Sequence, residues 1–551
     1  MHAKVAVSIH RASDGPVEAR VPSTPVPVRR WIPYCDNTVA FAAGFVALLA
    51  FGIYLRTMLP STGFWDTGEA QTVPPTLSIF HPTGFPTYAM LGWLWSQLPM
   101  GEVAWRMNLL SGVSVAIASG LVVLISGHLI GERERALRAT AAGIAGAAFA
   151  FASEPWENAA RADVHAISIL SVTVVVWLLI TWRAAERAGS PRAGRWLVGA
   201  ALAFGLGLGV HPLIGLFSPG IALWLFVVDR AIWRRWRLVA LCVVAGAIGI
   251  ASFAYIWIRA ITDPEPPLFY ARPDTLDRFR YLVLAEQFSG LFRDFEEPLA
   301  DIGEKWADAE RVLAAQFVAP GWLLVAIGAA VVGSRSLGTL AVLALFVAGN
   351  VFYSMNFRDG DIDRYYMPTV AVLAPLIGVA LAAIATACAQ AVAEVDRRLV
   401  TGLGARRRLA ALGGALVLGL GALLPTASLV TGYGAHDQSQ NRDADEWVAS
   451  AYALLPPNSV IVSWWSYSTP LWHHRWVLGH RPDLTIIDER DILDEGYRTM
   501  NNAIRAHFGE RPVYVVLPGW QRASVTARWE MSTVPTLPGF TRLLLVEGPA
   551  T

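Results

Sequence analysis

The sequence predicts a polytopic α-helical membrane protein with about eleven transmembrane helices and a small α/β domain at its C-terminal end. Three observations support this fold class. Of the 551 residues, 54% are hydrophobic and only 16% are charged, whereas a soluble domain is usually about 25% charged. Apolar runs long enough to cross a bilayer recur between residues 39 and 430. From residue 431, short β-branched runs take their place.

Apolar runs define the predicted membrane domain, residues 39–430. A bilayer core about 30 Å thick requires about 20 helical residues. Runs near this length lie at 39–58, 103–128, 138–154, 164–182, 196–211, 213–228, 238–258, 319–334, 337–353, 367–388 and 409–430. The fifth and sixth runs are short and meet at Pro212, a residue type that breaks helices. The first run lacks a clear small-residue cleavage site, so we interpret it as an uncleaved anchor.

Arginines fall at every second connection between these runs. A pair of arginines precedes the first run, and the later clusters are "GERERALR", "WRAAERAGSPRAGRW", "DRAIWRRWR" and "RRLVTGLGARRRL". The other connections carry mixed or acidic charge. For a multi-pass protein of the cell membrane, the positive-inside rule then places the N-terminus in the cytoplasm and residues 59–102, 259–318 and 431–551 outside it. Residues 1–38, rich in proline and arginine, are expected to form a disordered cytoplasmic tail.

Residues 431–551 have the pattern of a small extracytoplasmic α/β domain. The runs "SVIVSWW", "DLTIID", "PVYVVLP" and "TRLLLVE" predict strands, because β-branched residues favour them. Helical patterns at 443–455 and 491–507 alternate with these runs. The adjacent His473 and His474 have no cysteine or acidic ligand at zinc spacing, so we expect them to be solvated or packed.

The polar segments are distributed unevenly along the chain, which bears on function. The long ones all fall on the predicted outer side, and the sequence contains no internal repeat. Transporters built from repeats show matching helix interruptions in their two halves, so this asymmetry favours an enzyme at the outer membrane surface. The cysteines Cys35, Cys242 and Cys388 lie in or beside apolar runs and provide no disulfide framework, which argues against redox chemistry.

The stretch "FWDTGEAQTVPPTLSIFHPTGFP" places two carboxylates and a histidine among four prolines. Asp66 and Glu69 are three residues apart and would share one face of a helix. In one interpretation they form a capping box that begins a short helix ended by Pro74 and Pro75. In the other, Asp66 is a general base for an acceptor hydroxyl, and Glu69 is its partner or a second candidate. His81 would bind Asp66 or the substrate, or would be a structural histidine.

The segment "WDTGEAQTVPPTLSIFHPTGFPTYAMLGWLWSQLPMGEVAWRMNLLSG" resembles the start of a membrane protein family long catalogued as a domain of unknown function. The family pattern runs Asp-Ser/Thr-Gly-Glu, then His-Pro-Pro-Gly-Tyr-Pro, then Arg-x-Asn-Leu. Its eukaryotic relative is a protein O-mannosyltransferase, and the family is assigned to the C-type (GT-C) membrane glycosyltransferases. Thr83 and Phe85 stand where Pro and Tyr are usual. The matching residues are Asp66, Gly68, Glu69, His81, Pro82, Gly84, Pro86, Arg106 and Asn108.

The resemblance continues more weakly downstream. "ARADVHAISIL" is similar to an Ala-Glu-Val-Tyr segment of the family, with Asp163 and His165 in place of Glu and Tyr. "GLGLGVHPLIGLFSPG" resembles its glycine-rich helix with a histidine, here His211, and "YIWIRA" contains the matching Arg259. "SWWSYSTPLWHHRWVLGHRPDLTIIDERDILDEG" resembles the C-terminal region of many bacterial relatives.

The resemblance implies a GT-C-like fold and chemistry on a lipid-linked sugar, most simply mannosyl transfer. A polyprenyl phosphate sugar in the outer leaflet would donate to a hydroxyl of a protein or a glycan, usually with inversion. Asp66 and Glu69 are the expected catalytic residues. Membrane lipid is an expected partner and nucleic acid is not, and no metal or cofactor is expected beyond the lipid-linked sugar as co-substrate.

Arginine suits the leaving phosphate, because its fork of donors matches the phosphate oxygens. The expected donor-binding residues are His81, Arg259, Arg364 and His211. Arg259, at the outer end of an apolar run, could instead be a snorkelling anchor, and His211 could fill a helix break beside Pro212. Arg364 lies in "RDGDIDRYY", which resembles a calcium loop but lacks glycine at loop position six and glutamate at position twelve.

Two other classes of protein stay open as alternatives. A transporter or flippase for lipid-linked glycan precursors would show paired broken helices near the membrane midplane. A binding module anchored by a helical bundle would carry a binding signature in residues 431–551, such as a glycine-rich phosphate loop, and the sequence has none there.

Overall fold

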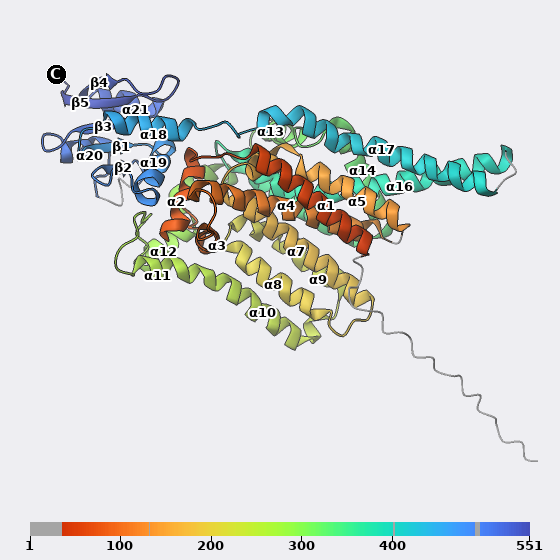
Figure 1. Ribbon diagram of the computed structural model, residues 1–551. Helices are drawn as coiled ribbons and strands as arrows, with labels where there is room; N and C mark the ends of the chain where they lie inside the picture. Colours follow the sequence, from red (N-terminus) through yellow and green to blue (C-terminus); the bar gives the residue numbers. More distant parts are fainter. Residues whose placement is uncertain (1–35, 132, 400–402, 491–495, 551) are drawn as a thin grey trace, which may run out of the picture.

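The chain folds into a long helical bundle with an α/β domain packed on one end (Figure 1). The computed structural model describes residues 36–131, 133–399, 403–490 and 496–550. The predicted tail therefore lies almost entirely outside the described residues, as does Cys35. The bundle ends with α17 at His436, six residues later than the boundary predicted at residue 430, because the apolar helix continues through "TGYGAH".

Long apolar helices make the chain a multi-pass membrane protein. Within the described residues, seven helical segments are long and apolar enough to cross a membrane, and nine if each of two bent pairs counts as one span. The bent pairs are α5 (Arg135–Ala150) with α6 (Ser153–Ala159), and α13 (Ile302–Ala314) with α14 (Ala319–Arg335). The seven are α1 (Asn37–Thr57), α4 (Val103–Ile130), α7 (Val164–Arg187), α10 (Trp236–Ile250) with α11 (Ala254–Ala260), α15 (Leu337–Asn356), α16 (Met367–Leu399) and α17 (Leu403–His436).

Each of the eleven predicted runs overlaps an apolar helix. The two short ones correspond to α8 (Gly194–Leu208) and α9 (Ser218–Val228), which are shorter than the seven candidate spans. A 3-10 turn over Pro212–Phe217 separates them, as expected from the proline. The helices are confirmed, and the figure of eleven complete spans stays a prediction.

Helix α4 lies at the centre of the bundle, where it packs against α1, α5, α7 and α16. Glycines on α4 let α1 approach closely: a Cβ at Gly127 would lie 2.8 Å from Val39, and one at Gly120 would lie 3.1 Å from the Ala43 carbonyl oxygen. Small residues at helix contacts replace the hydrophobic driving force that lipid cannot supply. The C-terminal half of α4 is thereby packed closely against the start of α1.

The C-terminal domain is built on a five-stranded mixed sheet of order β2-β1-β3-β5-β4. β1, β2 and β3 are parallel, whereas β5 runs antiparallel to β3 and β4. The strands are β1 (Val460–Ser463), β2 (Thr485–Asp488), β3 (Val513–Val516), β4 (Trp529–Val534) and β5 (Leu543–Pro549). The helices are α18 (Asp443–Leu454), α19 (Trp465–Trp472), α20 (Met500–His507) and α21 (Gly519–Thr526). The four predicted strand runs become β1, β2, β3 and β5; of the helix predicted at 491–507, α20 forms the last part, and 491–495 lies outside the described residues.

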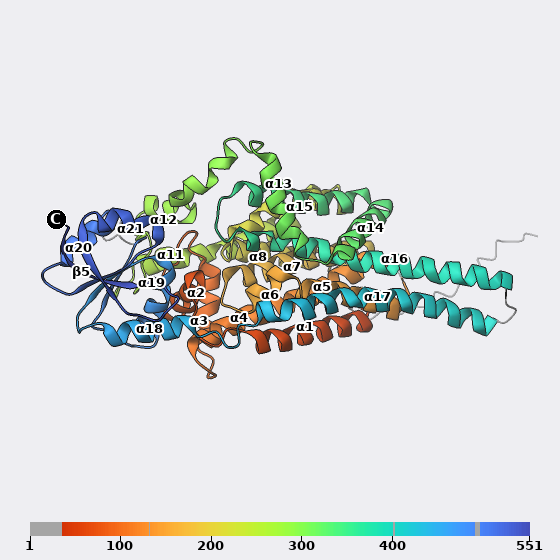
Figure 2. The same cartoon turned by 90° about the horizontal axis from the view of Figure 1, so that it is seen from above.

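The three segments predicted to share the outer side do meet at one end of the bundle (Figure 2). The first loop contributes α2 (Trp65–Thr76) and α3 (Pro86–Ser96), and the long loop contributes α12 (Leu276–Val283). One hydrophobic core joins these loops to the C-terminal domain, with Tyr88, Leu282 and Trp465 buried together. The candidate site lies in this shared region.

Candidate active site

Helix α2 begins without a capping box, so that interpretation of Asp66 and Glu69 is wrong. The N-cap position is Phe64, which makes no side-chain cap, and Asp66 lies in the first turn. Glu69 is almost fully buried in the next turn and accepts a hydrogen bond from the backbone N–H of His81 at 2.9 Å. Both prolines lie in the last turn of α2, which ends at Thr76, one residue after Pro75 and close to the predicted end. The two carboxylates are therefore available for interactions other than capping.

Glu69 is paired with His81. The ring Nδ1 of His81 contacts the second carboxylate oxygen of Glu69. Burial acts to lower the pKa of His81, but the charge of Glu69 and the hydrogen bond outweigh it, so the pKa is raised above its usual value. The rings of Phe85 and Trp465 enclose the imidazole, with centroids 5.2 and 5.4 Å away. Glu69 thus orients the imidazole of His81 and favours its protonated form.

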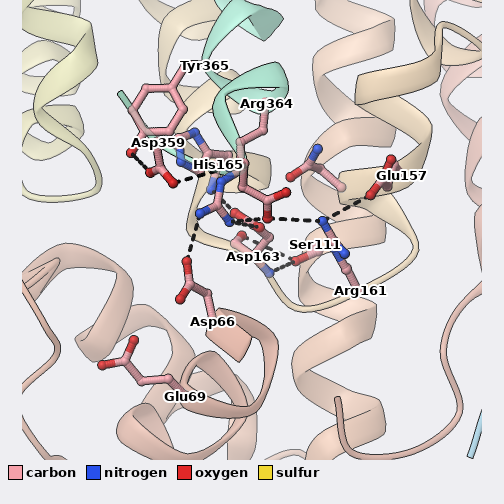
Figure 3. A network of polar contacts seen from close by, with 12 residues as sticks. Asp66, Glu69, Ser111, Glu157, Arg161, Asp163, His165, Asp359, Arg364 and Tyr365 are labelled. Carbon is pink, nitrogen blue, oxygen red and sulfur yellow. Dashed lines mark hydrogen bonds and ion pairs between the residues drawn. The ribbon is translucent and has the colours of Figure 1, made fainter. Parts of the chain in front are cut away.

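Asp66 is held by one donor on each carboxylate oxygen. The guanidinium of Arg364 donates to Oδ2 at 2.7 Å (Figure 3), and the indole Nε1 of Trp465 donates to Oδ1 at 2.8 Å. Burial acts to raise the pKa of Asp66, but the positive charges of Arg364, His81 and Arg490 outweigh it and hold the pKa well below its usual range. Asp66 is therefore an ionised, fixed carboxylate.

Arg364 links two loops by binding a second carboxylate. Its other terminal nitrogen donates to Asp163 at 3.0 Å, and Asp361 lies 3.7 Å from the same atom. Asp163 is the N-cap of α7 and accepts from the backbone N–H of His165 at 2.7 Å. Figure 3 shows Arg364 between Asp66 and Asp163. A buried guanidinium with two carboxylates satisfies the charges that burial would otherwise make costly.

Asn108 of α4 connects the first loop to the segment that precedes α7. Its side-chain oxygen accepts from Gln71 on α2 at 2.9 Å and from the backbone N–H of Ala162 at 2.8 Å, and its nitrogen donates to the carbonyl of Leu59 at 2.8 Å. Since Asn108 stands on the rigid centre of the bundle, these bonds set the distance between α2 and the start of α7. This accounts for the asparagine in the family pattern.

Two predicted donor-binding residues lie at the edges of this network. Arg259, in the last turn of α11, donates from Nε to the carbonyl of Leu77 at 2.7 Å; its two terminal nitrogens have no protein partner in the described part of the chain. His211 is buried and caps the 3-10 turn, where its Nδ1 accepts from Leu213 at 3.2 Å. Its ring stacks on Phe85, so its contacts are those of a structural residue.

Sequence reasoning gave no role to two residues of the C-terminal domain. Trp465 follows β1 and Arg490 follows β2, and the Arg490 guanidinium lies 3.9 Å from the centroid of the Trp465 ring. Both come directly after parallel strands, at the carboxyl edge where α/β sheets bind ligands. Because both strands were predicted from the sequence, this placement could have identified Trp465 and Arg490 as candidate site residues.

Asp66, Glu69 and His81 also form a group that could hold a metal ion, the ligand atoms all lying within 4.8 Å of one another. Carboxylate and imidazole ligands suit several divalent metals. In the observed arrangement, however, Glu69 and His81 bind each other, and both oxygens of Asp66 already accept hydrogen bonds. In this arrangement the carboxylates of Asp66 and Glu69 are bound by donors of the protein itself.

Comparison with known proteins finds relatives of this chain. Residues 66–234 match the protein O-mannosyl-transferase TMEM260 N-terminal domain, a match that begins at Asp66. The mouse protein O-mannosyl-transferase TMEM260 is 25% identical over 508 residues, which cover 86% of this chain and 67% of the mouse protein. The chain is a homologue of TMEM260. The Dictyostelium discoideum protein of the same name is 32% identical over 75 residues, 13% of this chain and 9% of that protein.

Solved structures agree on the fold of this TMEM260 homologue. ArnT from Cupriavidus metallidurans, solved in the apo state and bound to undecaprenyl phosphate, aligns with a TM-score of 0.50 at 15% identity. The alignment covers 92% of this chain and 97% of ArnT. The predicted resemblance to the GT-C glycosyltransferases is thereby confirmed for the fold.

Proposed function

We propose that this chain is a membrane mannosyltransferase that moves mannose from a polyprenyl phosphate donor to a hydroxyl of a protein or glycan at the extracytoplasmic face. Homology to TMEM260, named a protein O-mannosyl-transferase, supports the reaction class, and the fold of ArnT, solved with undecaprenyl phosphate, supports the donor class. The observation that carries the proposal is Asp66: a single carboxylate fixed in an ionised state where the first loop meets the C-terminal domain.

The proposed chemistry is a displacement at the anomeric carbon. The bond from this carbon to the phosphate oxygen breaks, its electron pair leaves with the polyprenyl phosphate, and the acceptor oxygen bonds from the opposite face. The hydroxyl proton passes to Asp66. A carboxylate with a low pKa is a weak base, but it suffices when the proton moves late, after the sugar has gained positive charge. Asp66 would also stabilise that charge.

The leaving phosphate needs cations. Arg259 is our proposed phosphate ligand, because its two terminal nitrogens are available at the end of α11, beside the carbonyl of Leu77. His81, whose pKa is raised by the charge of Glu69, is proposed to supply a second positive charge. Arg364, also predicted to bind the donor, is proposed to act through Asp66, since it already binds two carboxylates. His211 is proposed to support the packing behind Phe85.

The proposed reaction needs no metal ion, because Arg259 and His81 would supply the positive charges that a metal would bring. Prolonged dialysis against a strong chelator is expected to leave transfer within about twofold of the untreated enzyme. Loss of activity on dialysis, with recovery on adding back one divalent metal, would instead assign Asp66, Glu69 and His81 as its ligands.

The test of the function follows the label of a radioactive sugar. Purified full-length protein in lipid vesicles receives polyprenyl phosphate linked to labelled mannose, glucose or galactose, with an extract of acceptor proteins and glycans. Release of mannose label from the lipid into an acceptor, absent in the Asp66→Asn protein, supports the proposal. Movement of intact labelled lipid between leaflets without sugar release would support a flippase, and release of another sugar would correct the donor.

A further inference from the structure

A cavity lined by basic and apolar side chains lies within the bundle, at the end away from the C-terminal domain. It has a volume of about 230 Å³ and is formed where α4, α7 and α14 end and α15 begins. Apolar wall residues include Ile180, Trp224 and Val332. The proposed active site does not reach this region, which belongs to the side predicted to face the cytoplasm.

Three arginines line this cavity. Arg183 and Arg187 come from the end of α7, and Arg335 comes from the last turn of α14. No aspartate or glutamate lines the cavity, and within the described ranges none of the three arginines forms an ion pair. Glu186, between the first two in sequence, is engaged by Trp182 and Arg235. The positive charge is therefore uncompensated by the protein residues described.

Two of the three arginines are held in place by hydrogen bonds to the protein. Arg183 donates to the hydroxyl of Thr339 at 2.6 Å and lies over the ring of Trp224, whereas Arg335 reaches carbonyls at the end of α4. The Nε2 atom of His128 is buried in the lining and has no hydrogen-bond partner among the described residues. Because Nδ1 of this ring donates to the carbonyl oxygen of Leu124 at 2.8 Å, Nε2 of the neutral imidazole is an acceptor, and the described residues leave it without a donor.

We propose that this cavity binds a phosphate group, carried by an anionic phospholipid of the inner leaflet. Guanidinium forks match phosphate oxygens, and basic pockets between transmembrane helices on the cytoplasmic side accept anionic head groups. The apolar wall favours a lipid as the source, since glycerol and acyl carbons would lie against it. The site would lock α7, α14 and α15 together at the end of the bundle opposite to catalysis.

The test compares two double variants of the full chain in a neutral detergent at physiological salt. The cavity variant is Arg187→Gln with Arg335→Gln, because both side chains are exposed and their substitution is expected to spare the fold. The matched control is Arg195→Gln with Arg230→Gln, two exposed arginines near the same end that do not line the cavity. Phosphatidylglycerol with a fluorescent acyl chain is titrated into each protein, and phosphatidylcholine with the same label is the neutral probe.

We expect the cavity variant to bind phosphatidylglycerol at least about tenfold more weakly, because each arginine contributes a charged hydrogen bond, and the control to match the original protein. Unchanged gel-filtration behaviour and sugar transfer would show that the cavity variant is folded. Equal loss in both double variants, or equal binding of the two lipids, would overturn the site. Displacement of the labelled lipid by glycerol phosphate or inorganic phosphate at similar concentration would keep the phosphate site and overturn the lipid source.

Discussion

The carboxylate of Asp66 differs from that of Glu69 in its partners more than in its position. Glu69 is neutralised by an adjacent imidazole, whereas Asp66 receives one hydrogen bond from an arginine and one from an indole. Each donor bonds one oxygen atom of Asp66, and together the two bonds fix the plane of the carboxylate. A base needs this fixed geometry relative to the acceptor hydroxyl, and so we assign the proton transfer to Asp66.

The substitution Asp66→Asn tests this assignment, because it keeps the size of the side chain and removes its basicity. Turnover is expected to fall by about 10² to 10⁴-fold, with little change in donor affinity. Glu69→Gln is expected to cost less. The control is Asp361→Asn, which removes only an exposed carboxylate 3.7 Å from Arg364 and should retain turnover within about twofold. Normal turnover of Asp66→Asn, measured with saturating labelled donor, would contradict the assignment.

The Glu69–His81 pair predicts a pH dependence of stability. The folded-state pKa of His81 lies above its unfolded value of about 6.5. The pair therefore stabilises the fold fully below about pH 6.5, and this contribution is lost as the pH rises through the folded-state pKa. The thermal midpoint of the protein should fall with rising pH in that window, and Glu69→Gln should flatten the curve. Glu157→Gln, at a half-exposed ion pair, is the control; an unchanged slope in Glu69→Gln would refute the pairing.

Part of this site could be predicted from the sequence and part could not. Asp66, Glu69 and His81 were expected together because one stiff loop carries them all. Their arrangement was not, since a capping box and a catalytic pair have the same spacing. The bond from Arg364 to Asp66 spans 298 residues and the bond from Trp465 spans 399, and nothing local to either residue type indicates such a partner.

At the scale of elements, the contact of α19 with α2 joins the C-terminal domain to the site. Gly68 permits the approach, because a Cβ there would lie 2.7 Å from the hydroxyl of Thr469 on α19. The helix then presents Trp465 to Asp66. The C-terminal domain therefore contributes to the geometry of the site, beyond the acceptor contacts that an outer domain would suggest.

Trp465→Phe tests that contribution, since it keeps an aromatic ring and removes the indole N–H. Loss of one hydrogen bond to a charged group is expected to lower turnover about tenfold. Trp464→Phe is a matched control: it is the neighbouring residue, and its Nε1 has no hydrogen-bond partner among the described residues. Steady-state transfer rates measure both proteins. Equal rates for the two variants would show that the Asp66–Trp465 bond does not contribute.

The elements themselves were largely predictable, because hydropathy and β-branching are local signals. Every long apolar run became a helix, and the β-branched runs became the parallel strands and β5. β4, "WEMSTV", was missed: it is an edge strand with only Trp529 buried, so it shows no apolar pattern. The bends between α5 and α6 and between α13 and α14 were also not expected, as they depend on packing rather than composition.

At the scale of the whole molecule, the two ends of the bundle differ in charge and in content. One end gathers both long loops and the C-terminal domain around the candidate site, and the other carries the arginine-lined cavity. The positive-inside rule predicts that the first end faces the extracytoplasmic side, where a lipid-linked sugar in the outer leaflet would be within reach.

Single cysteines test this orientation in a cysteine-free background. Gln97→Cys, Ser289→Cys and Gln440→Cys replace exposed residues of the first loop, the long loop and the approach to the C-terminal domain. All three are expected to react with an impermeant thiol reagent in intact cells, and Ser334→Cys, exposed at the opposite end, only after the cells are opened. Labelling of only one or two of the first three in intact cells would contradict the orientation.

The two hydrogen bonds to Asp66 also determine when the site can form during synthesis of the chain. The carboxylate leaves the ribosome long before its partners, which are encoded 298 and 399 residues later. At a translation rate of about 5 to 20 residues per second, the first loop would wait tens of seconds beside lipid-linked sugars with its base unanchored. We therefore expect the nascent chain to reach full transfer activity only after residue 465 has been translated and the final domain has docked, and membrane fragments from interrupted translation to be less active than the full chain.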